Sequence, residues 1–308
     1  MSLTRVLHRG FCSAQSMFPP VTTPMLPAGT FNNKVALITG GGTGIGKGMT
    51  EMFAQLGANV AIVSRKQDVL DKTAREISDK TGRKILPVAA DVRNPEAVAA
   101  AVDRCEKELG LPDMVVNNAA GNFISPTERL SANAWRTIVD IVLNGTAIVT
   151  LDVGKRLIKA KKGANFLAVS ATYTNFGSGF CAPSAAAKSG VETLMMSLAA
   201  EWAKYGMRFN CISPGAVYTK GAFSRLDPGG DMSAELLKGA IERMGEVPEV
   251  ANLAAYLVSD YSSWLSGEVI RIDGANLNYC ASVFNKLSEL PQEQWKDIEA
   301  AIRSTKDS

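Results

Sequence analysis

Histidine is almost absent from this sequence. The only histidine among the 308 residues is His8, close to the N-terminus. Catalytic schemes that need a histidine base in the folded body, such as Ser-His-Asp and Cys-His arrangements, are therefore excluded, together with most zinc chemistry. The sequence predicts no metal site.

Cysteine pairs, long apolar runs and a strong net charge are also missing. The five cysteines show neither paired spacing nor a Cys-x-x-Cys motif, so a disulfide framework is not expected and a reducing compartment fits better. No apolar run reaches the roughly 18 residues that span a bilayer, which predicts no stable membrane insertion. The formal charge of +3 is small and the basic residues are scattered, so nucleic-acid binding is not expected.

Acidic residues are absent from the N-terminal segment, and the first of them is Glu51. Residues 1–33 are basic and rich in Ser and Thr. This composition is typical of a mitochondrial transit peptide and predicts the mitochondrial matrix. A disordered leader without a targeting role is the alternative. The C-terminal Lys-Asp-Ser is not a peroxisomal address.

Apolar runs typical of strands alternate with helical patterns after this leader. Strands are predicted at 34–40, 59–63, 84–90, 113–117, 165–170, 208–213 and 269–273, and helices at 47–56, 68–80, 95–109, 132–161 and 184–205. The alternation indicates βαβ units and a doubly wound parallel sheet of the α/β class. With 46% hydrophobic residues the chain can bury a large core, and no linker divides it. Residues 34–308 are therefore expected to form a single domain.

The end of this domain is predicted to be a helical extension. Trp295, Ile298 and Ile302 recur at helical spacing within residues 291–306. We expect this helix to pack on the body or on a neighbouring subunit. A helix that binds another partner is the alternative.

A glycine-rich loop joins the first predicted strand to the first helix. It consists of Gly40, Gly41, Gly42, Thr43, Gly44, Ile45 and Gly46. Glycines at this position let the backbone turn tightly and approach a pyrophosphate, while the helix N-terminus supplies N–H groups and positive dipole. The order of strand, loop and helix predicts dinucleotide binding. A plain tight turn is the alternative.

The second predicted strand ends in Ser64, Arg65 and Lys66. A site for NAD usually places an acidic residue here for the ribose 2′-hydroxyl, and none lies between Glu51 and Asp68. A hydroxyl and two cations instead suit charge-assisted hydrogen bonds to a 2′-phosphate. NADPH is therefore favoured over NADH, with solvated surface charge as the alternative.

The glycine-rich loop, the Asn-Asn-Ala-Ala-Gly turn at 117–121 and Ser-Pro-Gly at 213–215 together resemble the short-chain dehydrogenase/reductase family. The resemblance covers roughly residues 34–274. It implies a Rossmann-type sheet of about seven strands, a nicotinamide cofactor and a homotetramer. The further cofactor contacts that it implies are Asp91, Val92, Asn118, Lys188, Pro214, Gly215, Ala216 and Val217.

The departures from the family pattern are informative. Ser184 stands where most members have the catalytic Tyr, four residues before Lys188. The usual catalytic Ser falls near Ala171, and the usual Asn of the preceding helix falls at Val142. A mechanism in which a Tyr passes a proton to a ketone oxygen is therefore unsupported.

Within the family, the altered site resembles the mitochondrial 2,4-dienoyl-CoA reductases. The resemblance rests on Tyr173, displaced upstream, and on the strings NNAAGNFISPTERLS at 117–131 and GAFSRLDP at 221–228. It implies NADPH-dependent reduction of a 2,4-dienoyl-CoA thioester to the trans-3-enoyl-CoA in β-oxidation of unsaturated fatty acids. Another acyl-thioester reductase of the family, of the peroxisomal dienoyl or enoyl type, and a catalytically inactive NADP-binding protein are the alternatives.

The resemblance also implies residue roles. Hydride delivered to C5 of a dienoyl thioester moves negative charge to the thioester oxygen, so hydrogen-bond donors to that oxygen become important. The implied donors are Tyr173 and Asn122, and Lys188 with Ser184 would hold the nicotinamide ribose. Packing is the alternative role for Tyr173, and a turn is the alternative for Asn122.

The acyl-CoA substrate implies a further set of contacts. Its phosphates would meet Arg93 and Arg225, and its acyl end would meet Phe123 and Ser131. A surface salt bridge is the alternative role for each arginine.

Overall fold

The centre of the molecule is one parallel sheet of seven strands in the order β3-β2-β1-β4-β5-β6-β7. The computed structural model describes residues 18–219, 221 and 240–305. The strands are β1 (Val35–Thr39), β2 (Asn59–Ser64), β3 (Ile85–Ala89), β4 (Met114–Asn117), β5 (Ala164–Val169), β6 (Met207–Pro214) and β7 (Val269–Ile272). Each lies close to its predicted range. The predicted α/β class, doubly wound sheet and single domain are confirmed.

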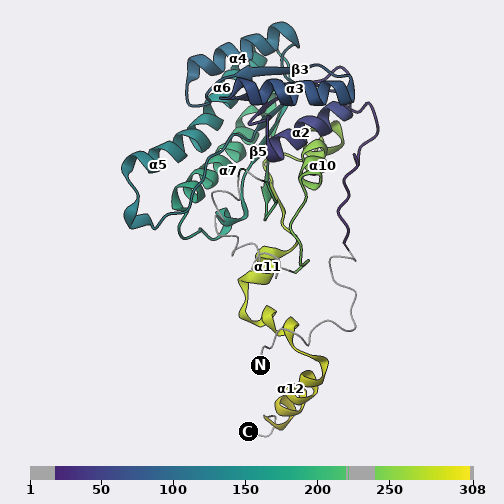
Figure 1. The fold of residues 1–308 in the computed structure, drawn as a ribbon, viewed down its shortest axis with the longest axis vertical. Coiled ribbons are helices and arrows are strands. Elements are labelled where there is room, and N and C mark those ends of the chain that lie inside the picture. Colours follow the sequence, from purple (N-terminus) through teal and green to yellow (C-terminus); the bar gives the residue numbers. More distant parts are fainter. Residues whose placement is uncertain (1–17, 220, 222–239, 306–308) are drawn as a thin grey trace.

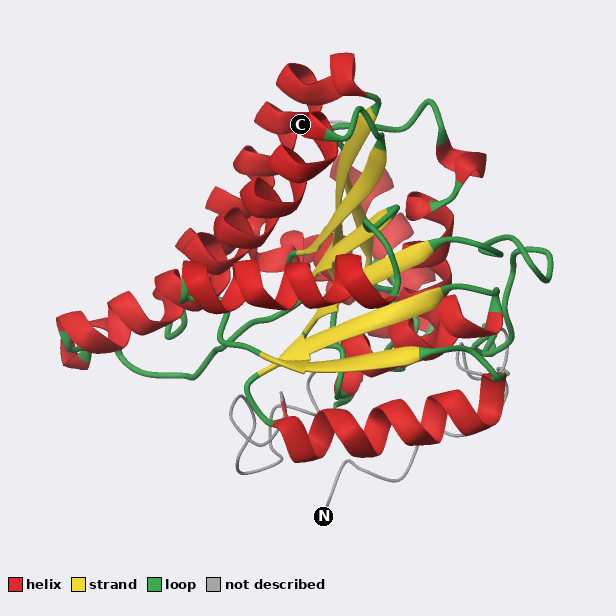
Figure 2. Cartoon of the chain, turned by 90° about the horizontal axis from the view of Figure 1, so that it is seen from above, coloured by secondary structure: helices red, strands yellow, loops and turns green. Residues whose placement is uncertain are grey.

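Helices cover both faces of the sheet (Figures 1 and 2). One face packs on α2 (Gly44–Gln55), α3 (Gln67–Thr81) and α10 (Val247–Val258), and the other on α4 (Pro95–Glu108), α6 (Gly145–Lys159) and α7 (Ala182–Trp202). Neighbouring strand residues serve opposite layers, so Leu37 joins the second core and Ile38 the first. Burial on both faces explains the unbroken apolar runs in the strands. No element was predicted between residues 213 and 269, where the structure has α10.

The strand order changes direction at β1. This strand pairs with β2 on one side and with β4 on the other. The first crossovers run towards β3 and the later ones towards β7, so the loops at the carboxyl ends of β1 and β4 diverge. Ligands of open α/β sheets bind in the crevice at this point. The glycine-rich loop follows β1 and therefore lies at this edge.

Residues 23–33 are attached to the body, although they belong to the range predicted as a leader. Phe31 is 2% exposed and its ring lies 5.4 Å from that of Phe53. The amide of buried Asn252 on α10 accepts from Met25 N–H at 2.9 Å and donates to the Thr23 carbonyl at 2.9 Å. The folded unit thus begins before residue 34. Residues 1–17 lie outside the described part, and the transit peptide stays a prediction.

Replacing Asn252 by Ala tests this attachment. The variant loses both hydrogen bonds, so we expect the free energy of unfolding to fall by about 1–2 kcal/mol. The urea denaturation midpoint measures the change, with Asn133→Ala, at an exposed position, as the matched control. Equal midpoints for the two variants would contradict the attachment.

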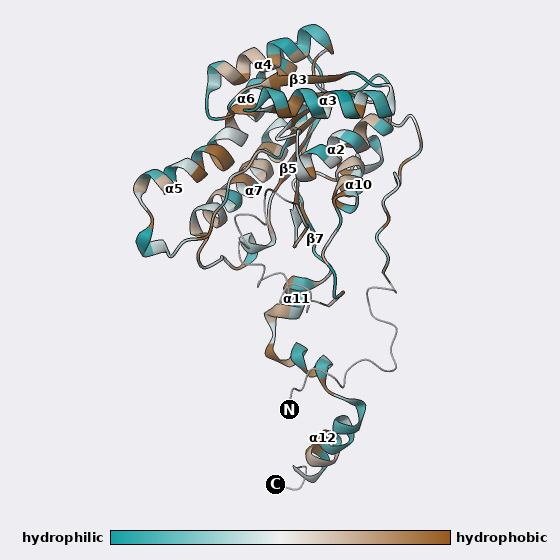
Figure 3. Ribbon diagram, viewed as in Figure 1, coloured by the Kyte–Doolittle hydropathy of each residue, from teal (hydrophilic) through white to brown (hydrophobic). Residues whose placement is uncertain are grey.

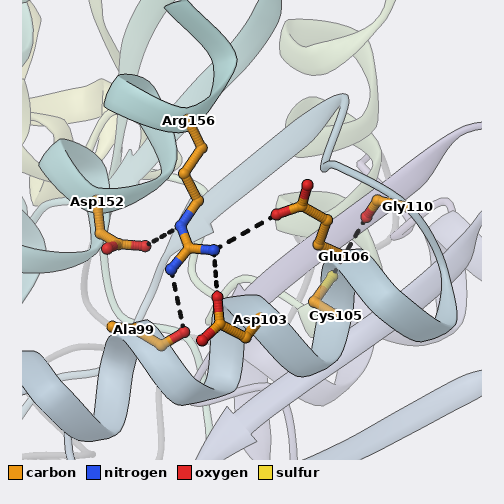
Figure 4. A network of polar contacts seen from close by, with 7 residues as sticks. All are labelled: Ala99, Asp103, Cys105, Glu106, Gly110, Asp152 and Arg156. Carbon is orange, nitrogen blue, oxygen red and sulfur yellow. Dashed lines mark hydrogen bonds and ion pairs between the residues drawn. The ribbon is translucent and has the colours of Figure 1, made fainter. Parts of the chain in front are cut away.

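An arginine on α6 links this helix to α4 (Figure 4). Arg156 contacts Asp152 on its own helix at 2.9 Å and Glu106 on α4 at 3.4 Å, and it also pairs with Asp103. One guanidinium nitrogen donates to the Ala99 carbonyl at 3.3 Å. The cluster fixes the two helices side by side on the outside of the sheet.

The helical segment that leads into α6 is long. It runs from α5 (Ala132–Val139) through a π-helical turn, η3 (Asp140–Asn144), into α6. By length and composition alone, Ala132–Lys159 could cross a membrane, but 44% of its most apolar window is buried inside the fold. Val149, Val153 and Leu157 are part of the core, so the apolar side of α6 serves to cover the sheet.

The C-terminal extension projects from the body beyond β7 (Figure 1). It consists of α11 (Asn276–Ala281), the 3-10 helix η7 (Val283–Glu289) and α12 (Gln292–Ser304). The predicted terminal helix is therefore present. It carries hydrophobic and hydrophilic residues (Figure 3), and none of the residues of α12 is buried. Among the described residues, α12 does not pack on the body of the chain.

Candidate active site

The glycine-rich loop is tightly bound to the neighbouring strand ends. Gly40 and Gly44 have positive φ values of 67° and 52°. A Cβ atom at Gly46 would lie 2.2 Å from the Gly40 carbonyl oxygen, so only glycine fits where α2 begins. The Asn118 amide donates to the carbonyls of Thr39 and Gly40 at 3.0 and 3.3 Å. Asn118 thus holds the loop in shape.

The cations predicted to select the cofactor phosphate follow β2 at the same edge. Ser64 is the last residue of β2, and Arg65 and Lys66 are exposed before α3 begins. The helix that they precede packs against the glycine-rich loop, because a Cβ atom at Gly42 would lie 3.2 Å from Leu70 on α3. This edge of the sheet therefore combines the glycine-rich loop, at the N-terminus of α2, with two exposed positive charges.

Asp91 and Arg93 form an ion pair after β3. Arg93 reaches the Asp91 carboxylate at 2.6 Å, and its hydrogen bonds hold the pKa of Asp91 below the ordinary value. Between them Val92 is buried at 7% exposure and contacts Gly145. The charge that Arg93 would offer to a CoA phosphate is thus shared with Asp91.

Tyr173 lies in η4 (Thr172–Asn175), directly after β5, and reaches α7. Its hydroxyl oxygen is 2.8 Å from Ser184 Oγ in the first turn of that helix. Burial raises the pKa of the phenol, with the Ser184 hydrogen bond acting in the opposite direction. Tyr173 is therefore protonated at neutral pH and can donate a hydrogen bond.

Lys188 lies one helical turn beyond Ser184 and is 7% exposed. Its ammonium group donates to the Val169 carbonyl at the end of β5. Burial lowers the pKa of Lys188 to about 8, while Cys211 and Glu192 act in the opposite direction. The structure thus brings Tyr173, Ser184 and Lys188 together, as predicted.

The residues at the other catalytic positions of the family lack the usual groups. Val142 is 1% exposed within the π-helical turn, where it packs in the core. Ala171 has no side-chain donor. π-Helical turns are frequent at functional sites, and in this turn the position of the usual Asn holds the apolar Val142.

Asn122 lies in the loop after β4, beside the loop of Tyr173. The two loops are joined by a hydrogen bond from Ser125 N–H to the Phe180 carbonyl at 2.8 Å. Asn122 Oδ1 accepts from Phe123 N–H at 2.9 Å. This bond uses the acceptor end of the amide, and among the described residues its donor end has no hydrogen-bond partner.

The residues assigned to the acyl group have different surroundings. Phe123 is half-buried against the core. Ser131 is exposed and caps α5, where its hydroxyl accepts from Ala134 N–H at 3.1 Å. Arg225 lies outside the described residues.

The segment after β6 completes the edge. Pro214 ends β6, and Gly215, Ala216 and Val217 follow it. A Cβ atom at Gly44 would lie 3.3 Å from Thr219, so this segment extends to the glycine-rich loop. The assigned cofactor contacts thus lie on consecutive loops at one edge of the sheet.

Comparison with known proteins identifies the family. A family model described as Enoyl-(Acyl carrier protein) reductase matches residues 40–275. The structure of a short chain dehydrogenase from Bacillus anthracis matches with a TM-score of 0.75 and 37% identity, covering 80% of this chain and 97% of that one. The chain belongs to the short-chain dehydrogenase/reductase family.

Two relatives in Caenorhabditis elegans cover nearly the whole chain. One, named an uncharacterized oxidoreductase, is 48% identical over 298 residues, which are 94% of this chain and 94% of the relative. The other is named probable 2,4-dienoyl-CoA reductase 3, (3E)-enoyl-CoA-producing. It is 45% identical over 295 residues, which are 94% of this chain and 96% of the relative.

As a short-chain dehydrogenase/reductase, the protein is an oxidoreductase that uses a nicotinamide cofactor. The structure fits such a group. The glycine-rich loop, where side chains at Gly40, Gly41 and Gly46 would collide with neighbouring atoms, lies at the N-terminus of α2 and would accept the pyrophosphate there. Lys188 would face the nicotinamide ribose beside Ser184.

One residue close to Tyr173 and Lys188 was not predicted from the sequence. Glu192 lies four residues beyond Lys188, and its carboxylate accepts hydrogen bonds from Ser170 and from Thr174, the latter at 2.9 Å. The spacing of Ser184, Lys188 and Glu192 places all three on one helix face. This four-residue spacing could have identified Glu192 from the sequence.

Proposed function

We propose that the protein is an NADPH-dependent 2,4-dienoyl-CoA reductase that produces trans-3-enoyl-CoA in β-oxidation of unsaturated fatty acids. The observation that carries the proposal is the hydrogen bond between Tyr173 and Ser184. It brings a phenol to the site from a neighbouring turn, while the usual proton-donor position on α7 holds only a serine. The named relative at 45% identity supports the same substrate class.

The residues at the site suit stabilisation of a developing negative charge. When bound, reduced nicotinamide supplies a hydride. Tyr173 and Asn122 each offer a neutral hydrogen-bond donor to the thioester oxygen, on which charge accumulates as the dienolate forms. In comparable oxyanion sites one such donor contributes about 2.7–4 kcal/mol to stabilising the transition state. Lys188 orients the cofactor ribose.

Proton transfer at carbon needs a separate source. The only histidine is His8, and neither Tyr173 nor Asn122 is required to become anionic when it donates a hydrogen bond. We propose that water protonates C2 of the dienolate. The tyrosine then acts as an electrostatic donor and keeps its proton.

The direct test mixes purified protein, NADPH and 2,4-hexadienoyl-CoA and follows the absorbance of the reduced nicotinamide. Oxidation of NADPH with formation of trans-3-hexenoyl-CoA supports the proposal. Reduction of crotonyl-CoA alone would indicate an enoyl reductase. Absence of turnover with hexadienoyl and decadienoyl thioesters would indicate an inactive NADP-binding protein.

The cofactor preference is expected to depend on the cations after β2. Replacing both Arg65 and Lys66 by Ala removes the partners of the 2′-phosphate. We expect the ratio of kcat/KM for NADPH over NADH to fall by about 10–100-fold. Lys72→Ala, which removes an exposed charge from α3, is the matched control. An unchanged ratio in the double variant would refute this assignment.

We also propose that the protein works in the mitochondrial matrix, as a homotetramer. The basic, acid-free N-terminal composition supports the location, and the family resemblance supports the tetramer. Fusion of residues 1–33 to a fluorescent protein tests import, and light scattering on the purified protein measures its mass.

A further inference from the structure

We propose, on the basis of the reductase function proposed above, that Glu192 is a positioning residue, which fixes the turn carrying Tyr173 and provides the counter-charge for Lys188. Glu192 lies on α7, in line with two residues of the site. Ser184 bonds the Tyr173 hydroxyl, Lys188 bonds the Val169 carbonyl, and Glu192 bonds the hydroxyls of Ser170 and Thr174. Three successive turns of one helix thus hold the segment from the end of β5 through η4.

The Glu192 carboxylate accepts hydrogen bonds from residues before and after Tyr173 in the sequence. Ser170 and Thr174, which flank Tyr173, donate to the same oxygen, Oε1. The Thr174 hydroxyl oxygen also lies 3.0 Å from the Ala171 carbonyl oxygen, so its single hydrogen is shared between this carbonyl and the Glu192 carboxylate. Hydrogen bonds to a charged acceptor are about twice as strong as neutral ones. The backbone that aims Tyr173 is therefore anchored by an ionised group.

The same carboxylate acts on Lys188 through charge. The titratable groups that face the lysine are Glu192 on its own helix and Cys211 on β6, and Tyr173 lies nearby on η4. Burial raises the pKa of Cys211 to about 12 and also raises that of Tyr173, so both are neutral at neutral pH. Glu192 is thus the anion that favours the protonated form of Lys188.

The structure predicts two effects of Glu192→Gln, which preserves shape and removes the charge. First, kcat with NADPH and 2,4-hexadienoyl-CoA falls about tenfold, because the turn of Tyr173 is held less firmly. Second, as the pH is raised, the affinity for the cofactor falls at a lower pH than in the parent protein, because Lys188 loses its proton more readily without the Glu192 charge. Glu201→Gln, the same change at an exposed position of α7, should leave both properties unchanged.

A double-mutant cycle shows whether Glu192 acts through the turn. Thr174→Val removes one of the two hydroxyls that the carboxylate binds and keeps the side-chain shape. We expect Thr174→Val to lower kcat by about threefold and to have little further effect in a Glu192→Gln background. Multiplication of the two effects would mean that the residues act independently and would overturn the positioning role.

The cofactor titration separates this proposal from the proposed function. Cofactor fluorescence gives the dissociation constant of NADPH, or of NADH if that binds more tightly, between about pH 6 and 10 without any acyl substrate. If the parent protein reduces no dienoyl-CoA, the reductase proposal fails, while the pH profile still tests Glu192. Coincident profiles for the parent, Glu192→Gln and Glu201→Gln would overturn the counter-charge role.

Discussion

Replacing Tyr173 by Phe should lower kcat for 2,4-hexadienoyl-CoA by about 10²–10³-fold. The variant keeps the ring and loses the hydroxyl that lies 2.8 Å from Ser184. Removal of one donor from an oxyanion site costs about 2.7–4 kcal/mol in the transition state, and this loss appears in kcat because the charge is absent from the bound substrate.

Steady-state kinetics with a matched control measures this loss. Tyr261→Phe removes a hydroxyl at a position that is 62% exposed and should leave kcat unchanged. The KM for the thioester should change little, since the ground-state thioester gains little from the phenol. A kcat for Tyr173→Phe within about twofold of the parent would remove Tyr173 from the proposed mechanism.

Replacing Lys188 by Met should lower activity strongly and stabilise the cofactor-free protein. In the proposed mechanism the ammonium group holds the ribose of the cofactor, so we expect kcat/KM for the cofactor to fall by about 10²–10³-fold. The free protein, however, buries this ammonium group at 7% exposure, where it donates to the Val169 carbonyl. Burial lowers its pKa to about 8 although Cys211 and Glu192 act in the opposite direction, so the protonated lysine is less favourable in the folded protein than in the unfolded chain. Its removal should relieve that cost.

The pH dependence of this stabilisation has a definite sign. Burial lowers the pKa of Lys188 from 10.5 to about 8, so between these values the unfolded chain holds more protons than the folded one. The free energy of unfolding therefore rises with pH across that interval. Below the interval the buried, protonated lysine lowers the free energy of unfolding by its full amount. Lys188→Met should raise Tm more at about pH 7 than at about pH 10.

Thermal unfolding of the cofactor-free protein at the two pH values measures the difference. Lys155→Met, at an exposed position of α6, is the matched control and should show no comparable rise. A lower Tm for Lys188→Met at neutral pH would show that the lysine contributes more to the fold than its burial costs.

Much of the fold was predictable because its strands are buried on both faces. All residues of β1 are buried, and such runs are apolar throughout, with glycine at the turn that follows. α10 was not predicted, although its sequence is strongly apolar and Pro248 lies in its first turn, because the motifs found after residue 213 end at 228. Packing of residues 23–33 was also not predicted, since the contacts of Phe31 with Phe53 and of this segment with Asn252 join residues far apart in the sequence.

Part of the site was also predictable from the sequence. The glycine-rich loop has a local signal, because its backbone shape requires glycine. The contact between Tyr173 and Ser184 joins residues that are 11 positions apart and has no such signal. The ion pair of Asp91 and Arg93 and the capping role of Ser131 follow from local geometry that composition does not reveal. Helical spacing identifies Glu192 only once Ser184 and Lys188 are known to face the site.

The position of Tyr173 on η4 separates the proposed hydrogen-bond donor to the substrate from the helix that carries Lys188. In the usual family arrangement the proton donor and the cofactor-holding lysine share one helix, so neither can shift alone. Here the lysine stays on α7 while the phenol comes from a short turn outside it. In the proposed mechanism, a substitution at Tyr173 can therefore change the hydrogen-bond donor to the substrate while Lys188 keeps its place on α7.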